Sequence, residues 1–161
     1  LRKALHLTNE RIPHDWRTSE NIVVEDDPAH AEISLRNLRK ARISNTITHV
    51  TDGQQALDYL FHEGEFSDHA TSPTPNLILL DLRLPKVDGL EVLARVKNDE
   101  KLQKIPIVVL TTSAAEVDIL KAYSYNVNSY LVKPLDFNVF SQLLESFGFY
   151  WLAWNKYPDM E

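Results

Sequence analysis

The sequence NLILLD at residues 76–81 is a short apolar run that ends in an aspartate. Four consecutive aliphatic residues without alternating polar ones are typical of a strand that is buried on both faces, as in a parallel sheet. A second run of this kind, IPIVVLT, occupies residues 105–111. The two runs predict two central strands of a sheet.

Strand-like and helix-like segments alternate along the rest of the chain. Further strands are predicted at residues 21–25, 46–50 and 129–133, and helices at 28–42, 53–63, 88–98, 114–125 and 136–154. Five strands that alternate with five helices predict an α/β fold, a doubly wound parallel sheet covered on both sides. The less apolar TITHV at residues 46–50 is expected at an edge of this sheet.

The composition argues against several classes of protein. A chain of 161 residues is long enough for one domain with a substantial core, and it contains no cysteine for disulfides or thiolate metal sites. The formal net charge of −6 argues against a nucleic-acid-binding surface. No apolar run approaches the roughly 20 residues that cross a bilayer. We therefore expect a soluble cytoplasmic domain with no membrane or nucleic-acid partner.

Side chains that can bind ions or take part in catalysis follow four of the predicted strands at their carboxyl ends. These residues are Glu25, Asp26 and Asp27 after the first strand, Asp81 after the third, Thr111 and Thr112 after the fourth, and Lys133 after the fifth. In open parallel sheets the ligand site lies beyond the carboxyl ends of the strands. A single acid there is commonly a turn residue, but acids at two ends with Thr and Lys at two others favour a functional site.

The chemistry of this set suits a phosphoryl group and a hard cation. Clustered carboxylates suit Mg²⁺, and a nearby lysine and hydroxyl suit phosphoryl oxygens on the same metal. Two mechanisms remain open, an aspartate that accepts a phosphoryl group and carboxylates that activate water for hydrolysis. Asp81, at the end of the most buried strand, fits the nucleophile best. Phosphatases of the haloacid-dehalogenase type need a second acid two residues later, where this sequence has Arg83.

Four motifs together resemble the receiver domain of two-component response regulators. They are IVVEDDP (22–28), LILLDLRLPKVDGLEVL (77–93), IPIVVLTTSA (105–114) and NSYLVKP (128–134). The resemblance covers about residues 21–146 and implies a flavodoxin-like fold. It leaves residues 1–20 as an N-terminal extension and residues 147–161 as an aromatic C-terminal extension of the last helix.

The resemblance assigns the phosphoryl chemistry to particular residues. Asp81 matches the phosphoacceptor, Lys133 the lysine that pairs with the phosphoryl group, and Thr111 the switch hydroxyl that moves towards it. Thr112 is the adjacent alternative to Thr111. Tyr130 matches the aromatic switch residue. The implied protein is a Mg²⁺-dependent phosphoacceptor that can lose its phosphoryl group by autodephosphorylation, rather than an enzyme.

The resemblance also divides the acidic run between two tasks. Asp26 matches a direct Mg²⁺ ligand, Glu25 one that acts mainly through a water, and Arg83 the residue whose backbone carbonyl completes the shell with Asp81. Asp27 is expected outside the pocket, as the cap of the helix that begins at Pro28. The family pattern further implies a cis peptide bond between Lys133 and Pro134.

The C-terminal part of the sequence bears on how the protein signals and on whether it forms a dimer. Only 28 residues follow Lys133, too few for a DNA-binding domain, so a stand-alone receiver that signals by protein contacts is expected. Tyr150, Trp151 and Trp154, with Leu152, are expected beyond the reach of the sheet, and they predict a homodimer interface.

A narrower resemblance is to the small regulators paired with cyanobacterial and bacterial phytochromes. It implies a phytochrome-type histidine kinase as phosphodonor and a homodimer. The rival hypothesis is a receiver-like interaction module that is never phosphorylated. The intact acids, together with Thr111 and Lys133, argue against that rival.

Overall fold

Five parallel strands form one sheet in a computed structural model, which describes residues 19–40 and 45–158. The strand order is β2-β1-β3-β4-β5, the doubly wound arrangement with its switch point between β1 and β3. The strands are β1 Ser19–Val24, β2 Asn45–Val50, β3 Leu77–Leu80, β4 Ile107–Thr111 and β5 Ser129–Val132. The predicted flavodoxin-like α/β fold is confirmed, and the predicted edge strand is β2.

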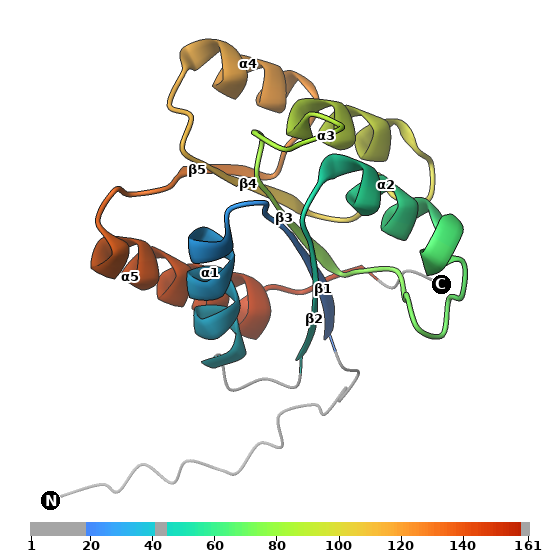
Figure 1. Cartoon of the computed structure of the whole chain (residues 1–161), viewed down its shortest axis with the longest axis horizontal. Coiled ribbons are helices and arrows are strands. Elements are labelled where there is room, and N and C mark those ends of the chain that lie inside the picture. Colours follow the sequence, from blue (N-terminus) through green and yellow to red (C-terminus); the bar gives the residue numbers. More distant parts are fainter. Residues whose placement is uncertain (1–18, 41–44, 159–161) are drawn as a thin grey trace, which may run out of the picture.

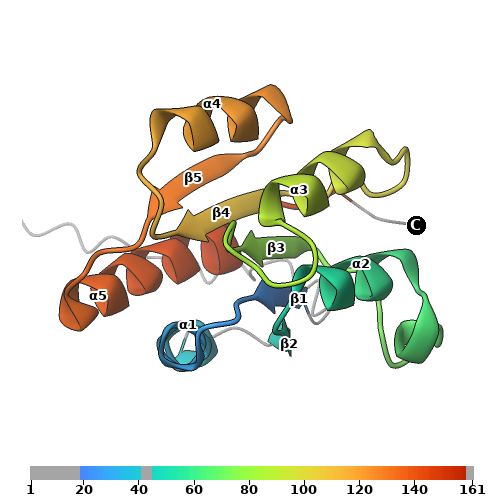
Figure 2. The same ribbon diagram turned by 45° about the horizontal axis from the view of Figure 1, so that its top comes forward.

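The helices cover both faces of this sheet (Figure 1). They are α1 Pro28–Lys40, α2 Gly53–Phe61, α3 Gly89–Asn98, α4 Glu116–Ser124 and α5 Phe137–Gly148. The helices α1 and α5 lie side by side on one face, and α2, α3 and α4 lie on the other (Figure 2). Within residues 19–40 and 45–158, no helix combines the length and apolar composition that crossing a membrane requires.

The first strand begins earlier than the sequence predicted. Ser19 and Glu20 belong to β1 rather than to an N-terminal extension. The side-chain oxygen of Asn76 accepts a hydrogen bond from the Glu20 N–H at 3.0 Å, and the Asn76 N–H donates to the Glu20 carbonyl at 2.6 Å. These two bonds hold the start of the strand. Residues 1–18 of the predicted extension lie outside the described residues.

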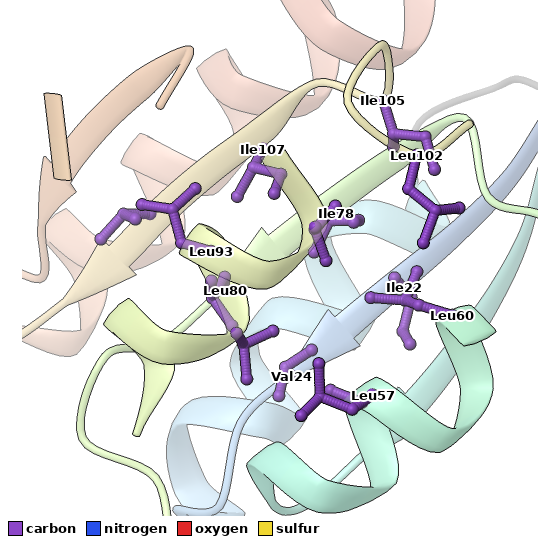
Figure 3. Close-up of a cluster of buried hydrophobic side chains, with 14 of the residues drawn as sticks. Ile22, Val24, Leu57, Leu60, Ile78, Leu80, Leu93, Leu102, Ile105 and Ile107 are labelled. Carbon is purple, nitrogen blue, oxygen red and sulfur yellow. The ribbon is translucent and has the colours of Figure 1, made fainter. Parts of the chain in front are cut away.

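The strand side chains alternate between two apolar clusters, one on each face of the sheet. In the first, Ile22, Ile78 and Ile107 lie against Leu57 of α2 and Leu93 of α3 (Figure 3). The second includes the intervening strand residues and α5: Val23, Leu79, Val108, Phe140 and Leu144. Burial on both faces explains why the central strands read as uninterrupted apolar runs.

The chain after α5 continues as a π-helical segment, Phe149–Trp154, which corrects one prediction. Leu152 is only 6% exposed, and Trp151 packs against the same cluster as Phe147. The spacing of five residues from Phe147 to Leu152 fits a π-helix, whose hydrogen bonds join residues five apart. The predicted absence of a core for Leu152 and Trp151 is therefore wrong.

The other aromatic side chains of this segment remain at the surface as predicted. Tyr150 is 56% exposed and Trp154 is 68% exposed, and Phe149, which the prediction omitted, is 64% exposed. Tyr157 lies further on, and its hydroxyl donates to the Trp151 carbonyl. The segment thus has one face on the core and one aromatic face towards solvent.

Candidate functional site

Three of the predicted acids meet at the carboxyl edge of the sheet. Glu25 follows β1 and Asp81 follows β3, and the two strands are hydrogen-bonded neighbours. One carboxylate oxygen from each of Glu25, Asp26 and Asp81 lies within 4.8 Å of the others. Glu25 and Asp81 are buried, whereas Asp26 is exposed. A hard cation that keeps some of its waters fits this set of oxygens.

The ammonium of Lys133 lies between two of these acids. Its Nζ donates to Glu25 Oε2, and to Asp81 Oδ2 at 3.1 Å, while the Lys133 side chain is 1% exposed. The Lys133 N–H donates to the Thr111 carbonyl at 2.7 Å, which continues the pairing of β4 with β5. The Lys133–Pro134 peptide bond is trans, so the cis prediction is wrong. The ammonium reaches both carboxylates with a trans bond.

The surroundings of Glu25 strongly perturb its acidity. Burial and, to a smaller extent, the charge of Asp81 raise the pKa of Glu25, while the hydrogen bond and charge of Lys133 lower it, and the net result is a pKa of about 7. Without a metal, about half of the Glu25 carboxyls are protonated near neutral pH. A cation bound beside Glu25 favours its ionised form.

Asp27 has the capping role that the sequence predicted. Its Oδ1 accepts hydrogen bonds from the backbone N–H groups of Ala29 at 2.9 Å and His30 at 3.0 Å, at the start of α1. The His30 N–H lowers the pKa of Asp27. Asp27 also donates its own N–H to Glu25 Oε1 at 3.0 Å, which helps to orient that carboxylate. The acidic run is therefore divided between the acid cluster and a helix cap.

Close packing fixes the loop that follows Asp81. A Cβ on Gly89 would lie 2.3 Å from the Asp81 carbonyl oxygen, and a Cβ on Gly53 would lie 1.9 Å from the Val87 oxygen. Both positions therefore require glycine for space. The Arg83 N–H donates to Asp81 Oδ1 at 3.3 Å, so the Arg83 backbone lies beside the phosphoacceptor candidate. The role of the Arg83 carbonyl as a metal ligand stays a prediction.

The switch candidates Thr111 and Tyr130 lie on the neighbouring strands β4 and β5. Thr111 is fully buried at the end of β4 while Thr112 is exposed, which favours Thr111. The Tyr130 hydroxyl donates to the Ser113 carbonyl at 2.8 Å, and burial raises the pKa of Tyr130. Both side chains are thus held near the loop between β4 and α4.

Two residues near the site were missed from the sequence. His30 Nδ1 lies 3.2 Å from Lys133 Nζ, and since an ammonium only donates, Nδ1 is the acceptor. Asp118 is buried and accepts hydrogen bonds from Arg83 and Ser113. Each lies in the first turn of a helix that follows a site strand, where a histidine or an acid is also common without a function. Their position in the first turn of such a helix is the only signal in the sequence that points to them.

Comparisons with known proteins agree with this geometry. Residues 22–145 match the response regulator receiver domain. The chain is 46% identical over 138 residues to the probable methanogenesis regulatory protein FilR2 of Methanothrix harundinacea (strain 6Ac), which covers 85% of this chain and 86% of FilR2. It is 39% identical over 131 residues to the response regulator Rcp1 of Synechocystis sp. (strain ATCC 27184 / PCC 6803 / Kazusa), which covers 81% of this chain and 87% of Rcp1.

Solved structures give the same result. The Mn²⁺-bound form of response regulator Rcp1 superposes with a TM-score of 0.84 at 37% identity, covering 88% of this chain and 99% of that one. The phosphorylated cyanobacterial phytochrome response regulator RcpA gives 0.83 at 37% identity with the same coverage. This chain belongs to the family of response regulator receiver domains. The rival hypothesis of a module that is never phosphorylated is not favoured, because the acids and the lysine are all in place.

Proposed function

We propose that Asp81 accepts a phosphoryl group from a histidine kinase and that the phosphorylated protein signals through protein contacts. The contact that carries this proposal is that of Lys133 Nζ with Asp81 Oδ2 at 3.1 Å, inside a cluster of three carboxylates. A buried ammonium at this position can meet the phosphoryl oxygens as their charge develops.

The transfer itself requires little covalent chemistry from the protein. A carboxylate oxygen of Asp81 attacks the phosphorus of a phosphohistidine, the P–N bond breaks, and the imidazole nitrogen keeps the electron pair. Asp81 is held in place by the Lys133 ammonium and by the Arg83 N–H. Attack of water on the phosphorus of the resulting acyl phosphate would return Asp81 to its free form, which is the autodephosphorylation we propose.

Mg²⁺ is the proposed cofactor of this site, held by Glu25, Asp26 and Asp81 with the Arg83 carbonyl. A bound Mg²⁺ neutralises charge on the transferred phosphoryl group. Support comes from the three carboxylates, each of which has one oxygen within 4.8 Å of the others. The Rcp1 structure was solved with Mn²⁺, an ion of similar preference for oxygen ligands.

Labelling with a small acyl-phosphate donor tests the role of Asp81. With Mg²⁺ present, the wild-type protein should take up phosphate and Asp81→Asn should not. Asp27→Asn is the matched control, because Asn caps a helix about as well as Asp and the residue lies outside the acid cluster. Equal labelling of wild type and Asp81→Asn would place the chemistry on another residue.

The phosphodonor is proposed to be a phytochrome-type histidine kinase in the cytoplasm. RcpA, which has nearly the same fold, is a phytochrome response regulator. The similarity to FilR2 favours a second candidate, a regulator of methanogenesis with a different sensor kinase. Phosphotransfer from a phytochrome kinase that changes between red light and darkness would support the first. If no phosphotransfer from that kinase can be detected, the second candidate, a different sensor kinase, is favoured.

We propose further that the protein forms a homodimer. Phe149, Tyr150 and Trp154 form an exposed aromatic face after α5. Full burial of a large apolar side chain contributes about 1.5–3 kcal/mol, which these three side chains do not gain while they face water. Light scattering should give a dimer for the wild type and a folded monomer when Tyr150 and Trp154 are both replaced by Ser. A double variant that remains dimeric would exclude this face as the interface.

A further inference from the structure

Asp118 in α4 is a buried carboxylate that is linked to Asp81 of the acid cluster through Arg83. A single oxygen, Oδ2, accepts two hydrogen bonds, from Arg83 Nη2 at 2.5 Å and from Ser113 Oγ at 2.5 Å. Arg83 is two residues after Asp81, and Ser113 is two residues after Thr111. Asp118 therefore joins the loop after the phosphoacceptor candidate to the loop after the switch threonine.

Apolar contacts hold α4 only weakly. Among its residues only Asp118 and Ala122 are buried. Val117, Leu120 and Tyr123 of the same helix are 57%, 63% and 53% exposed. The methyl group of an alanine contributes little burial, so the polar contacts of Asp118 provide a large part of what fixes the start of α4.

The same network reaches three of the site residues directly. The Arg83 N–H donates to Asp81 Oδ1, and the Ser113 N–H lies 3.4 Å from Thr111 Oγ1. The Tyr130 hydroxyl donates to the Ser113 carbonyl. A change in the Arg83–Asp118 contact can therefore be transmitted both to Asp81 and to Tyr130.

We propose that Asp118 is a positioning residue that holds the Arg83 guanidinium away from Asp81, and that a phosphoryl group on Asp81 competes with Asp118 for that guanidinium. The inference rests on the proposed phosphorylation of Asp81. Phosphorylation replaces a carboxylate by a group with a charge of about −1.5 to −2 and three strong acceptor oxygens. A guanidinium pairs well with such oxygens.

The burial of the two partners makes the competition one-sided. The Arg83 side chain is 57% exposed and can turn, whereas the Asp118 side chain is 8% exposed and cannot follow it. When Arg83 moves to the phosphoryl group, Asp118 keeps only Ser113 and becomes a buried charge without a cation. The start of α4 is then the element that shifts, so the charge at Asp81 alters the exposed apolar face of this helix.

A double-mutant cycle with beryllofluoride, a phosphoryl mimic, tests this coupling in the presence of Mg²⁺. Asp118→Asn keeps an oxygen for Ser113 but removes the charge that holds Arg83. It should therefore bind beryllofluoride roughly fivefold or more tightly than the wild type, the lower end of typical coupling between sites. In an Arg83→Gln background, Asp118→Asn should leave the affinity unchanged. Glu116→Gln, which removes an exposed acid from the same turn of α4, is the matched control and should change little.

Amide hydrogen exchange in α4 provides a readout that does not depend on the folding of an Asp118 variant. Arg83→Gln alters an exposed side chain, and it should speed exchange in α4 before any beryllofluoride is added. In the wild type, beryllofluoride should cause the same increase. Slow, unchanged exchange in Arg83→Gln would overturn the proposal.

The outcomes separate this inference from the proposed function. If wild type binds beryllofluoride, Asp81→Asn does not, and Asp118→Asn has the same effect with and without Arg83, then the competition is refuted and the phosphoacceptor stands. If wild type itself fails to bind, both are refuted.

Discussion

Proton release on Mg²⁺ binding is the most quantitative consequence of the site. Burial holds the pKa of Glu25 at about 7, and a bound cation requires the ionised carboxylate. Each Mg²⁺ should therefore displace about nine-tenths of a proton at pH 6, about half at pH 7 and about a tenth at pH 8. The Mg²⁺ affinity should rise nearly tenfold per pH unit below pH 7 and level off above it.

Calorimetric titration in buffers of different ionisation enthalpy measures this release. The slope of the observed enthalpy against the buffer enthalpy gives the number of protons per Mg²⁺ at each pH. Glu25→Gln is the control, because it retains Asp26 and Asp81 but lacks the Glu25 proton. A release by the wild type that does not vary between pH 6 and 8, or an equal release by Glu25→Gln, would refute the assignment.

The same carboxyl makes the stability of the metal-free protein depend on pH. The folded protein keeps the Glu25 proton up to about pH 7, whereas the unfolded chain releases it near the ordinary value of 4.5. The folded state therefore binds more protons between these values, and the free energy of unfolding falls as the pH rises through this window. The full loss is about 3 kcal/mol, and Mg²⁺ should offset it.

Three further predictions concern single side chains. Asp26→Ala should weaken Mg²⁺ binding far more than Asp27→Ala, since only Asp26 belongs to the acid cluster; the reverse order in a titration would contradict the assignment. Lys133→Ala should stay folded by circular dichroism in the presence of Mg²⁺ but bind beryllofluoride poorly, and wholesale unfolding would indicate a purely structural ion pair. Leu152→Ala should lower the free energy of unfolding by about 2–5 kcal/mol, whereas Trp154→Ala should change it by less than about 1 kcal/mol, as urea titration would show.

The fold could be predicted from the sequence because its strongest signals are local. The apolar runs at 76–81 and 105–111 become β3 and β4, each buried on both faces. The carboxyl ends of parallel strands then bring Glu25, Asp81 and Lys133 together without any knowledge of side-chain contacts. The sequence also predicts that Asp27 caps a helix rather than joining the acid cluster, because it precedes a proline that suits the first position of a helix.

The features that the sequence did not reveal depend on burial and on helix geometry. Asp118 reads as an ordinary acid in a first helical turn, and only the contact with Arg83 distinguishes it. His30 reads as a surface residue until Lys133 is placed beside it. An α-helical spacing that continues past Phe147 places Leu152 in solvent, but the chain forms a π-helix over Phe149–Trp154. In each case the missing information was a distance between segments or a change in helix period.

The charges at the edge of the sheet explain why the network around Arg83 would respond to phosphorylation. When Glu25, Asp26 and Asp81 are ionised they contribute three negative charges, and Lys133 supplies one positive charge against them. The remaining charge of −2 is the amount that one Mg²⁺ neutralises. Replacing the Asp81 carboxylate by an acyl phosphate adds up to about one more negative charge, which neither Mg²⁺ nor Lys133 balances. The guanidinium of Arg83 belongs to the residue two positions after Asp81, and it is held by an acid in α4. It is therefore the cation that the phosphorylated site would draw in, at the expense of the contact that holds α4.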